Sequence, residues 1–477
     1  MKTRSLTLFF LMTLATINVS GQQEVMDSIL ADTTLTGTSY SFCFADALTG
    51  EIIFSHDAER NLASASVMKL YPTSVALSLL GPCYYYTTTL LLSGDLNSKR
   101  GILDGDVIIA GGGDPALGSA LFREHYGNVI ENWVQALKDA GIRRINGRVA
   151  AGESIYDFNP APPGWEWGDL GYYYGAGVYD ININDNKFNI YLSGRSEGEP
   201  AVIDSVESFG LGITIINSLL SSGTSNRSEL YVAPYASTAT LTGSVPADTI
   251  TVFRASIPDP PMALVRRLDA ALRAAGIVIK GEPESVRLDP EEKKSVAIAV
   301  VNSPPLAEII KVTNHESVNM YAEAIRKHLG YEILGEGTFR AGSSVIRHFL
   351  DSIGCEPYEA VMLDGSGLTA NNNISALMTV RLLVHMHNSK YADAFISSLP
   401  MGALSGTMKN YFRDELFQGK VVAKTGTIAS AKSFAGFFTT NSGKKVAFTT
   451  FANGFTVSSR KITDNMEKIV REIMIKY

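Results

Sequence analysis

The segment Asn61-Leu-Ala-Ser-Ala-Ser-Val-Met-Lys-Leu70 places a serine and a lysine three residues apart, before a Leu- and Ala-rich run that predicts a helix to Leu80. If this helix starts near Ser66, residues three apart lie one above the other, and Lys69 is within reach of the Ser66 hydroxyl. A serine hydroxyl is a poor nucleophile until a base takes its proton. A lysine can be that base only when burial or another cation lowers its pKa. The pattern therefore indicates a nucleophile, Ser66, and its base, Lys69.

The Ser-x-x-Lys pattern alone is weak, because it occurs twice more, at Ser442 to Lys445 and at Ser458 to Lys461. Ser442 falls in a predicted hairpin turn, where the two side chains do not share a helical face. Ser458 precedes the final helix and has no second cation as a partner. A serine at a helix start is most often a capping residue, so the assignment of Ser66 depends on further motifs.

A second motif is Ser317-Val318-Asn319, a hydroxyl and an amide two residues apart. On a loop, both side chains can face a cleft. We expect Ser317 to relay a proton to a leaving amine. We expect Asn319 to bind a substrate amide and to orient Lys69.

A third motif, Lys424-Thr425-Gly426-Thr427, occurs once and follows an apolar run that predicts a strand. A strand edge can bind an extended peptide by main-chain hydrogen bonds. Gly426 would let the substrate backbone approach closely, and Lys424 with Thr425 would hold a terminal carboxylate. The motif therefore predicts the peptide-binding side of the site.

The first and third motifs also supply groups that would act together in the reaction. Lys424 supplies the second cation that would lower the pKa of Lys69. The backbone N–H groups of Ser66 and Thr427 would form an oxyanion hole for the tetrahedral intermediate. The combination predicts acyl transfer to serine.

The order of the three motifs, Ser-x-x-Lys, Ser-x-Asn and Lys-Thr-Gly, is that of penicillin-binding proteins and class A β-lactamases. Ser317 follows Ser66 by 251 residues, a gap too long for a β-lactamase-sized domain, and Lys424 follows Ser317 by 107. The chain resembles the low-molecular-mass class C penicillin-binding proteins, which carry large inserts in this gap. The other stretches that carry the resemblance are Gly105 to Pro115, Pro162 to Gly177, Asn182 to Asn186 and Asp364 to Leu368.

The resemblance implies an α+β fold related to the serine β-lactamases, with a five-stranded antiparallel sheet covered by helices and with large β-rich inserts. We expect the sheet and helices in residues 22–84 and 286–477, and the inserts in 85–285. Strand-like runs at 40–47, 52–55, 421–423, 433–440 and 445–451 agree with such a sheet. The implied activity is that of a D-alanyl-D-alanine carboxypeptidase or endopeptidase, with no metal and no cofactor. Peptidoglycan stem peptides would be the substrate, and β-lactams would be covalent inhibitors.

Two stretches depart from the family pattern. Relatives commonly carry an arginine shortly after the Asp-Gly-Ser-Gly-Leu stretch, where this chain reads Thr369-Ala-Asn-Asn372. Relatives often carry an acidic pair where this chain has Gly152-Glu153. Both regions can help to recognise the diamino-acid side chain of the stem peptide, and Glu153 is a candidate for that role.

The N-terminus predicts the location of the protein, the net charge bears on its partners, and the C-terminal tail leaves two arrangements open. Lys2 and Arg4 precede an apolar run and small residues, which predicts a signal peptide over residues 1–21 and a secreted, periplasmic protein. The net charge of −7 argues against a nucleic-acid partner. The helical tail from Lys461 to Tyr477 has one apolar face, which would either lie on a membrane or pack on the preceding sheet.

Two other classes of function compete with the hydrolase. Gly111 to Ala116, with Glu131 twenty residues after Gly111, imitates a dinucleotide fingerprint. However, residues 128–139 read as a helix, so Glu131 would not end a strand. A peptidoglycan-binding module without turnover would not need Ser66 or Lys69. A β-lactamase or esterase with the same centre is the nearer rival, and the long insert disfavours it.

Overall fold

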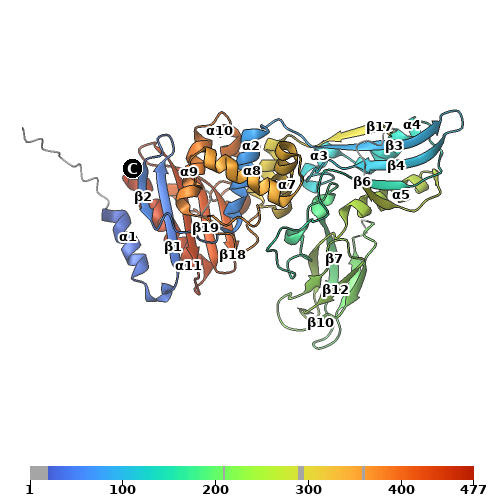
Figure 1. Ribbon diagram of the computed structural model, residues 1–477. Helices are drawn as coiled ribbons and strands as arrows, with labels where there is room; N and C mark the ends of the chain where they lie inside the picture. The colour runs from blue at the N-terminus through green and yellow to red at the C-terminus, as the bar shows by residue number, and fades with distance from the viewer. Residues whose placement is uncertain (1–19, 208–209, 288–294, 357–359) are drawn as a thin grey trace, which may run out of the picture.

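The computed structural model describes residues 20–207, 210–287, 295–356 and 360–477. It has a body, residues 20–86 and 303–477, and an insert, residues 87–302, that extends from the body as two β-rich arms (Figure 1). The predicted signal peptide lies almost entirely outside the described residues. Helix α1 already begins at Ser20, one residue before the end of that predicted segment.

The body is built on a five-stranded antiparallel sheet in the order β18-β19-β20-β1-β2, as the sequence predicts. The strand β18 is longer than the predicted run of 421–423 and continues through the Lys-Thr-Gly motif, because its whole length pairs with β19. The strands are β1 (Ser39–Asp46), β2 (Ile52–His56), β18 (Val421–Ile428), β19 (Ala431–Thr439) and β20 (Lys445–Asn453).

Both faces of the body sheet are covered. In β1, Phe42 and Phe44 join the core under α1 and α11, whereas Cys43 and Ala45 join the core under α9, as the two-residue period of a strand requires. Helices α1 (Ser20–Leu30) and α11 (Ser459–Lys476) lie on the first face. The remaining helices of the body are α2 (Leu70–Leu79), α6 (Leu306–His315), α7 (Asn319–Leu334), α8 (Phe339–Ser352), α9 (Ala376–His387) and α10 (Ala392–Ser397).

The apolar face of the C-terminal helix α11 packs on the sheet, which is the second of the two arrangements considered for the tail. Its buried members share a core with the phenylalanines of β1, and they are Ile462, Met466, Ile469, Val470, Ile473 and Met474. Among the described residues, no helix is both long enough and apolar enough to cross a membrane.

The first arm of the insert is a seven-stranded sheet with helices α4 and α5 beside it (Figure 1). Its last strand, β17, pairs with β3, so the insert ends at Asn302 and the predicted boundary at residue 285 is too early. The arm comprises β3 (Thr87–Asn97), β4 (Ile102–Ala110), α3 (Arg123–Tyr126), α4 (Val129–Asp139), β5 (Arg144–Ile145), β6 (Val149–Glu153), α5 (Pro260–Ala274), β15 (Val278–Ile279), β16 (Glu284–Arg287) and β17 (Ser295–Asn302).

The second arm consists of three small sheets. Its strands are β7 (Lys187–Ser193), β8 (Val202–Val206), β9 (Thr214–Asn217), β10 (Leu220–Ser221), β11 (Glu229–Tyr231), β12 (Thr238–Thr242), β13 (Ser244–Val245) and β14 (Ile250–Ser256). The body and the insert also contain short 3-10 turns. These are η1 (Thr33–Leu35), η2 (Ala65–Lys69), η3 (Ala120–Phe122), η4 (Tyr173–Gly175), η5 (Asn184–Asn186), η7 (Gly406–Met408) and η8 (Glu415–Phe417).

The insert leaves and re-enters the body at one narrow neck. The Tyr86 N–H donates to the Ser303 hydroxyl at 3.0 Å, and the Ser303 N–H donates to the Tyr86 carbonyl at 2.9 Å. A second connection runs along α7, where the buried Lys327 pairs with Asp157 of the insert at 2.7 Å. The insert is therefore fixed to the helix that begins at Asn319.

Candidate active site

Ser66 lies in the 3-10 turn η2, directly before α2, rather than in the first turn of an α-helix. The preceding residue, Ala65, has φ +46°, a left-handed conformation that is rare for a residue with a side chain. Gly367 packs against the Ala65 carbonyl so closely that a Cβ at this glycine would overlap it. The bend that presents Ser66 is thus held by a loop 300 residues away in the sequence.

Lys69 is fully buried and its ammonium group contacts three oxygen atoms. Its Nζ lies 3.0 Å from Ser66 Oγ, 2.6 Å from Asn319 Oδ1 and 2.6 Å from the Ser366 carbonyl oxygen. Burial lowers the pKa of Lys69 to about 7, although the carboxylates of Asp364 and Glu323 act in the opposite direction. A lysine with this pKa can accept the serine proton near neutral pH.

Asn319 is the first residue of α7 and links Lys69 to the insert. Its Oδ1 accepts from Lys69, and its Nδ2 donates to the Tyr174 carbonyl at 2.8 Å. With one end of the amide anchored on the insert, the oxygen is fixed toward the lysine. The sequence predicts this orienting role for Asn319, and the structure places the two groups in contact.

Ser317 and Lys424 form the second polar pair of the site. Ser317 lies between α6 and α7 with φ +58°, and its Oγ accepts from Lys424 Nζ at 2.9 Å. Lys424 also donates to the Thr425 carbonyl at 2.8 Å and is fully buried. Burial lowers the pKa of Lys424 well below its usual value, and the charges of Lys69 and Lys432 lower it further. Burial is therefore the main cause of the lowered pKa at both lysines.

The other residues of the Lys-Thr-Gly-Thr motif occupy distinct places on β18. Thr425 is buried, whereas Thr427 is exposed and its Oγ1 accepts from Lys432 Nζ at 2.9 Å. A Cβ on Gly426 would meet the Ser433 hydroxyl and the carbonyl of Ser64. The close approach at Gly426 is thus to the segment before the nucleophile, and not to the open cleft as the sequence suggests.

Glu323 is a buried site residue without a counterpart in the three motifs. Its Oε1 accepts from the N–H groups of Gly365 and Ser366, both at 2.7 Å, and its Oε2 accepts from Arg326 at 3.1 Å. Burial raises the pKa of Glu323 to about 7. Glu323 thereby fixes the loop whose carbonyl contacts Lys69. It lies one helical turn after Asn319, which is the only sequence feature that points to it.

Asp364 belongs to the same loop and binds its backbone. Its carboxylate accepts from the N–H groups of Gly367 at 2.7 Å and Thr369 at 2.8 Å, and from Trp165 Nε1 at 3.0 Å. A carboxylate that accepts several N–H bonds fixes loop geometry strongly. Trp165 therefore ties the insert to the loop that supports Ser66.

Ser66 opens into a cleft of about 760 Å³ between the body and the insert. From the body, the cleft is lined by Ser317, Asn319, Thr427 and the loop of residues 367–370. From the insert, Tyr173, Tyr174 and Arg254 contribute, and Arg254 lies 4.2 Å from the centre of the Tyr173 ring. The sequence predicts the body side of this cleft and misses the insert side.

Glu153, the candidate for recognition of the stem-peptide side chain, is not among the cleft-lining residues. It is buried at the end of β6, where it accepts a hydrogen bond from the Ser285 hydroxyl. Thr369 does line the cleft, and its N–H is held by Asp364. Within the described ranges, no group of three or more His, Cys, Asp or Glu side chains could hold a metal ion.

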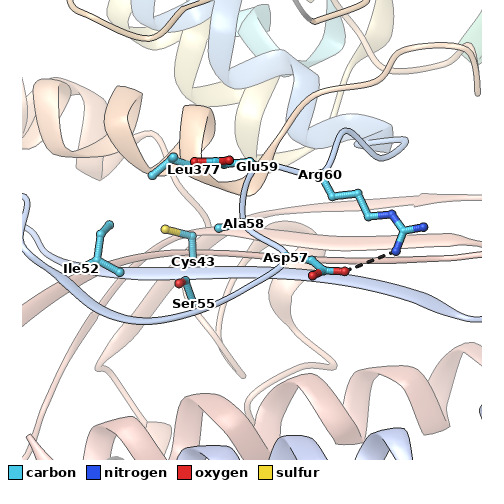
Figure 2. Close-up of a pocket in the computed structure, with 8 residues that line it drawn as sticks. All are labelled: Cys43, Ile52, Ser55, Asp57, Ala58, Glu59, Arg60 and Leu377. Carbon is cyan, nitrogen blue, oxygen red and sulfur yellow. Dashed lines mark hydrogen bonds and ion pairs between the residues drawn. The ribbon is translucent and has the colours of Figure 1, made fainter.

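A separate hollow of about 730 Å³ lies at the opposite edge of the body sheet, beside β2 and the start of α9. Figure 2 shows Arg60 reaching toward Asp57 there, at 3.3 Å, with the Cys43 thiol nearby. Burial raises the pKa of this thiol to about 12, so it is not a reactive thiolate. The hollow holds no pairing of a nucleophile with a base, in contrast to the cleft at Ser66.

Comparisons with known proteins agree with this geometry. The model of the D-Ala-D-Ala carboxypeptidase 3 (S13) family matches residues 22–473. The chain is 28% identical to a D-alanyl-D-alanine carboxypeptidase of Actinomadura sp. strain R39 over 446 residues, which cover 91% of this chain and 81% of that protein.

Solved structures show the same fold. The crystal structure of penicillin binding protein 4 from Haemophilus influenzae superposes with a TM-score of 0.83 at 22% identity, covering 95% of this chain and 99% of that one. A structure of the same protein in complex with a β-lactam superposes with a TM-score of 0.76 at 20% identity, covering 94% of this chain and 99% of that one.

Proposed function

Because the chain belongs to the D-Ala-D-Ala carboxypeptidase 3 (S13) family, we propose that it hydrolyses the D-Ala-D-Ala end of peptidoglycan stem peptides through an acyl-enzyme on Ser66. The observation that carries this proposal is the 3.0 Å contact between Lys69 Nζ and Ser66 Oγ, with the lysine pKa lowered to about 7. A neutral lysine at this distance is positioned to activate the hydroxyl.

The proposed reaction has two steps. Lys69 takes the Ser66 proton as Oγ attacks the peptide carbonyl, and the backbone N–H groups of Ser66 and Thr427 stabilise the oxyanion. The C–N bond breaks, and the amine leaves with a proton delivered through Ser317 and Lys424. Water then hydrolyses the ester and returns Ser66 to its free form. No metal and no cofactor take part.

The leaving group defines the activity. If the amine is D-alanine, the enzyme acts as a carboxypeptidase, and if the amine belongs to a second stem, it acts as an endopeptidase. The Lys424–Ser317–Thr425 side of the site suits a terminal carboxylate, because a carboxylate there would be held by charge-assisted hydrogen bonds. A β-lactam carries the same acylating carbonyl beside a carboxylate, and we therefore propose that β-lactams acylate Ser66.

We also infer that the protein is exported to the periplasm, where its substrate lies. The support is the positive start, the apolar run and the small residues within positions 1–21. Mass measurement of the mature protein purified from its own cells tests this inference, because cleavage near Gly21 predicts a chain that begins at or close to Gln22.

Intact-mass spectrometry of residues 22–477 before and after benzylpenicillin tests the acylation centre. We expect one stable adduct in the wild type and none in Ser66→Ala, with release of D-alanine from a D-Ala-D-Ala peptide by the wild type only. A folded wild type with neither adduct nor β-lactam hydrolysis would contradict the proposal and favour a binding module. Rapid β-lactam hydrolysis without D-alanine release would instead indicate a β-lactamase.

A further inference from the structure

The active-site cleft continues into a second groove between the two arms of the insert. This groove, which we call the arm groove, has a volume of about 740 Å³ and shares Asp185, Lys187 and Arg254 with the cleft that holds Ser66. Its walls come from α3 and α4 of the first arm, from β7 and β14 of the second, and from α5. A ligand at Ser66 can therefore extend into the arm groove without leaving the protein surface.

The arm groove is positively charged, although the whole chain has a net charge of −7. Its basic residues are Arg123, Lys187, Arg254 and Arg267, and its acidic residues are Asp185 and Glu207. Basic side chains gathered in a groove of an acidic protein indicate a site for an anionic ligand.

Both carboxylates of the arm groove are engaged within the protein. Asp185 accepts from Tyr321 at 2.6 Å and pairs with Lys187 at 2.8 Å. Glu207 accepts from the backbone and side-chain amides of Asn189, both at 2.9 Å. Each carboxylate thus has partners of its own, and Asp185 offsets the charge of Lys187.

Two of the arginines are available to a ligand. Arg123 and Arg254 are exposed, and no carboxylate of the described residues lies within ion-pair distance of either. Arg254 stands at the junction of the cleft and the groove, whereas Arg123 lines the groove alone. The two therefore offer positive charge from the junction with the cleft into the groove.

The groove joins the cleft near the Ser317-Val318-Asn319 motif. Tyr321, which donates to Asp185, lies two residues after Asn319 on α7, and Ser317 lies two residues before Asn319. Ser317 lines the same cleft as Asp185 and Arg254, which stand at its junction with the groove. In the proposed reaction, Ser317 delivers the proton to the amine that departs, so a long leaving group can run from Ser317 past Arg254 into the arm groove.

We propose that the arm groove binds the leaving stem of a cross-linked peptidoglycan peptide through the free carboxylates of that stem. The inference rests on the proposed function. Ser66 Oγ bonds to the carbonyl carbon of the cross-link, the C–N bond breaks, and the second stem departs as an amine with the proton delivered through Ser317. When D-alanine is the leaving group, it is too short to reach Arg123, so the groove favours cross-linked substrate over a single stem.

The test compares two substrates with matched variants. One substrate is a small peptide ending in D-Ala-D-Ala, and the other is a purified cross-linked muropeptide dimer. The variants are Arg123→Ala and Arg123→Glu, with Arg100→Ala as the control, since Arg100 is an exposed arginine of the same arm outside the groove. The readout is the ratio of kcat/KM for the dimer to kcat/KM for the small peptide.

We expect this ratio to fall about fivefold in Arg123→Ala, the size of one exposed ion pair, and further in Arg123→Glu, with Arg100→Ala unchanged. A dimer amidated at the carboxylates of its leaving stem, except the one beside the cleaved bond, should lose the same factor in the wild type and nothing more in Arg123→Ala. Unchanged ratios in both Arg123 variants would overturn the inference while leaving the proposed function intact. A wild type that turns over neither substrate would overturn both.

Discussion

The two lysines of the site are both fully buried, but they have opposite electrostatic surroundings. Lys69 lies near the carboxylates of Glu323 and Asp364, which offset part of its burial, and its pKa is about 7. At Lys424 the charges of Lys69 and Lys432 act in the same direction as burial and lower its pKa well below the usual value. The comparison teaches that burial alone does not set the role of a lysine, because the neighbouring charges decide whether its proton is available near neutral pH.

This difference indicates separate roles for Lys69 and Lys424. Lys69 can switch between its charged and neutral forms near pH 7, as a base must. Burial and neighbouring cations both lower the pKa of Lys424, and a substrate carboxylate beside it would act in the opposite direction. The three predictions that follow test this division.

The largest effect is expected for Lys69→Arg. An arginine keeps the positive charge but does not release its proton at neutral pH, so the rate of acylation by benzylpenicillin should fall about 10³-fold. Time-resolved intact mass measures the rate, and Lys69→Met guards against a packing effect of the larger side chain. Rates within tenfold of the wild type in both variants would transfer the role of base to Lys424.

A smaller effect, about 10²-fold in kcat/KM, is expected for Lys424→Met on a peptide ending in D-Ala-D-Ala. The wild type should prefer the free carboxylate of this peptide over its C-terminal amide, because the carboxylate can pair with Lys424. The variant should lose this preference, and competition between the two peptides measures it. A preference that survives in the variant would place carboxylate recognition elsewhere.

The smallest effect is expected for Glu323→Gln. Ionised Glu323 raises the pKa of Lys69, so its neutral replacement should shift the acidic limb of the pH dependence of kcat/KM to lower pH, with a rate change of about tenfold or less. Glu308→Gln on the exposed side of α6 is the matched control. If the acidic limb of the pH profile stays in place or moves to higher pH, Glu323 fixes the loop without raising the pKa of Lys69.

The sequence predicts the body of the site because its signals are local. Ser66 with Lys69, and Ser317 with Asn319, are close in sequence, and their order along the chain identifies the family. The sheet follows from apolar runs with clear turns, such as the one at Gly443, where φ is +87°. These features depend on neighbours within a few residues.

What the sequence does not reveal depends on distant contacts. The support of Lys69 by the Ser366 carbonyl joins residues 297 positions apart, and a backbone carbonyl leaves no mark in the sequence. Likewise, the pairing of β17 with β3 joins segments that are far apart in the sequence, and nothing near either strand indicates it. The boundary predicted at residue 285 is therefore too early, and the prediction from sequence misses the contribution of Arg254 to the cleft.

The neck between Tyr86 and Ser303 has a consequence for deletion of the insert. Because both ends of the insert meet at one pair of hydrogen bonds, the body chain could be rejoined there without breaking its sheet. The body, however, relies on the insert, since the Tyr174 carbonyl anchors Asn319 and Trp165 holds Asp364. A body rejoined at the neck would therefore keep its sheet but lose two contacts that position the groups around Lys69.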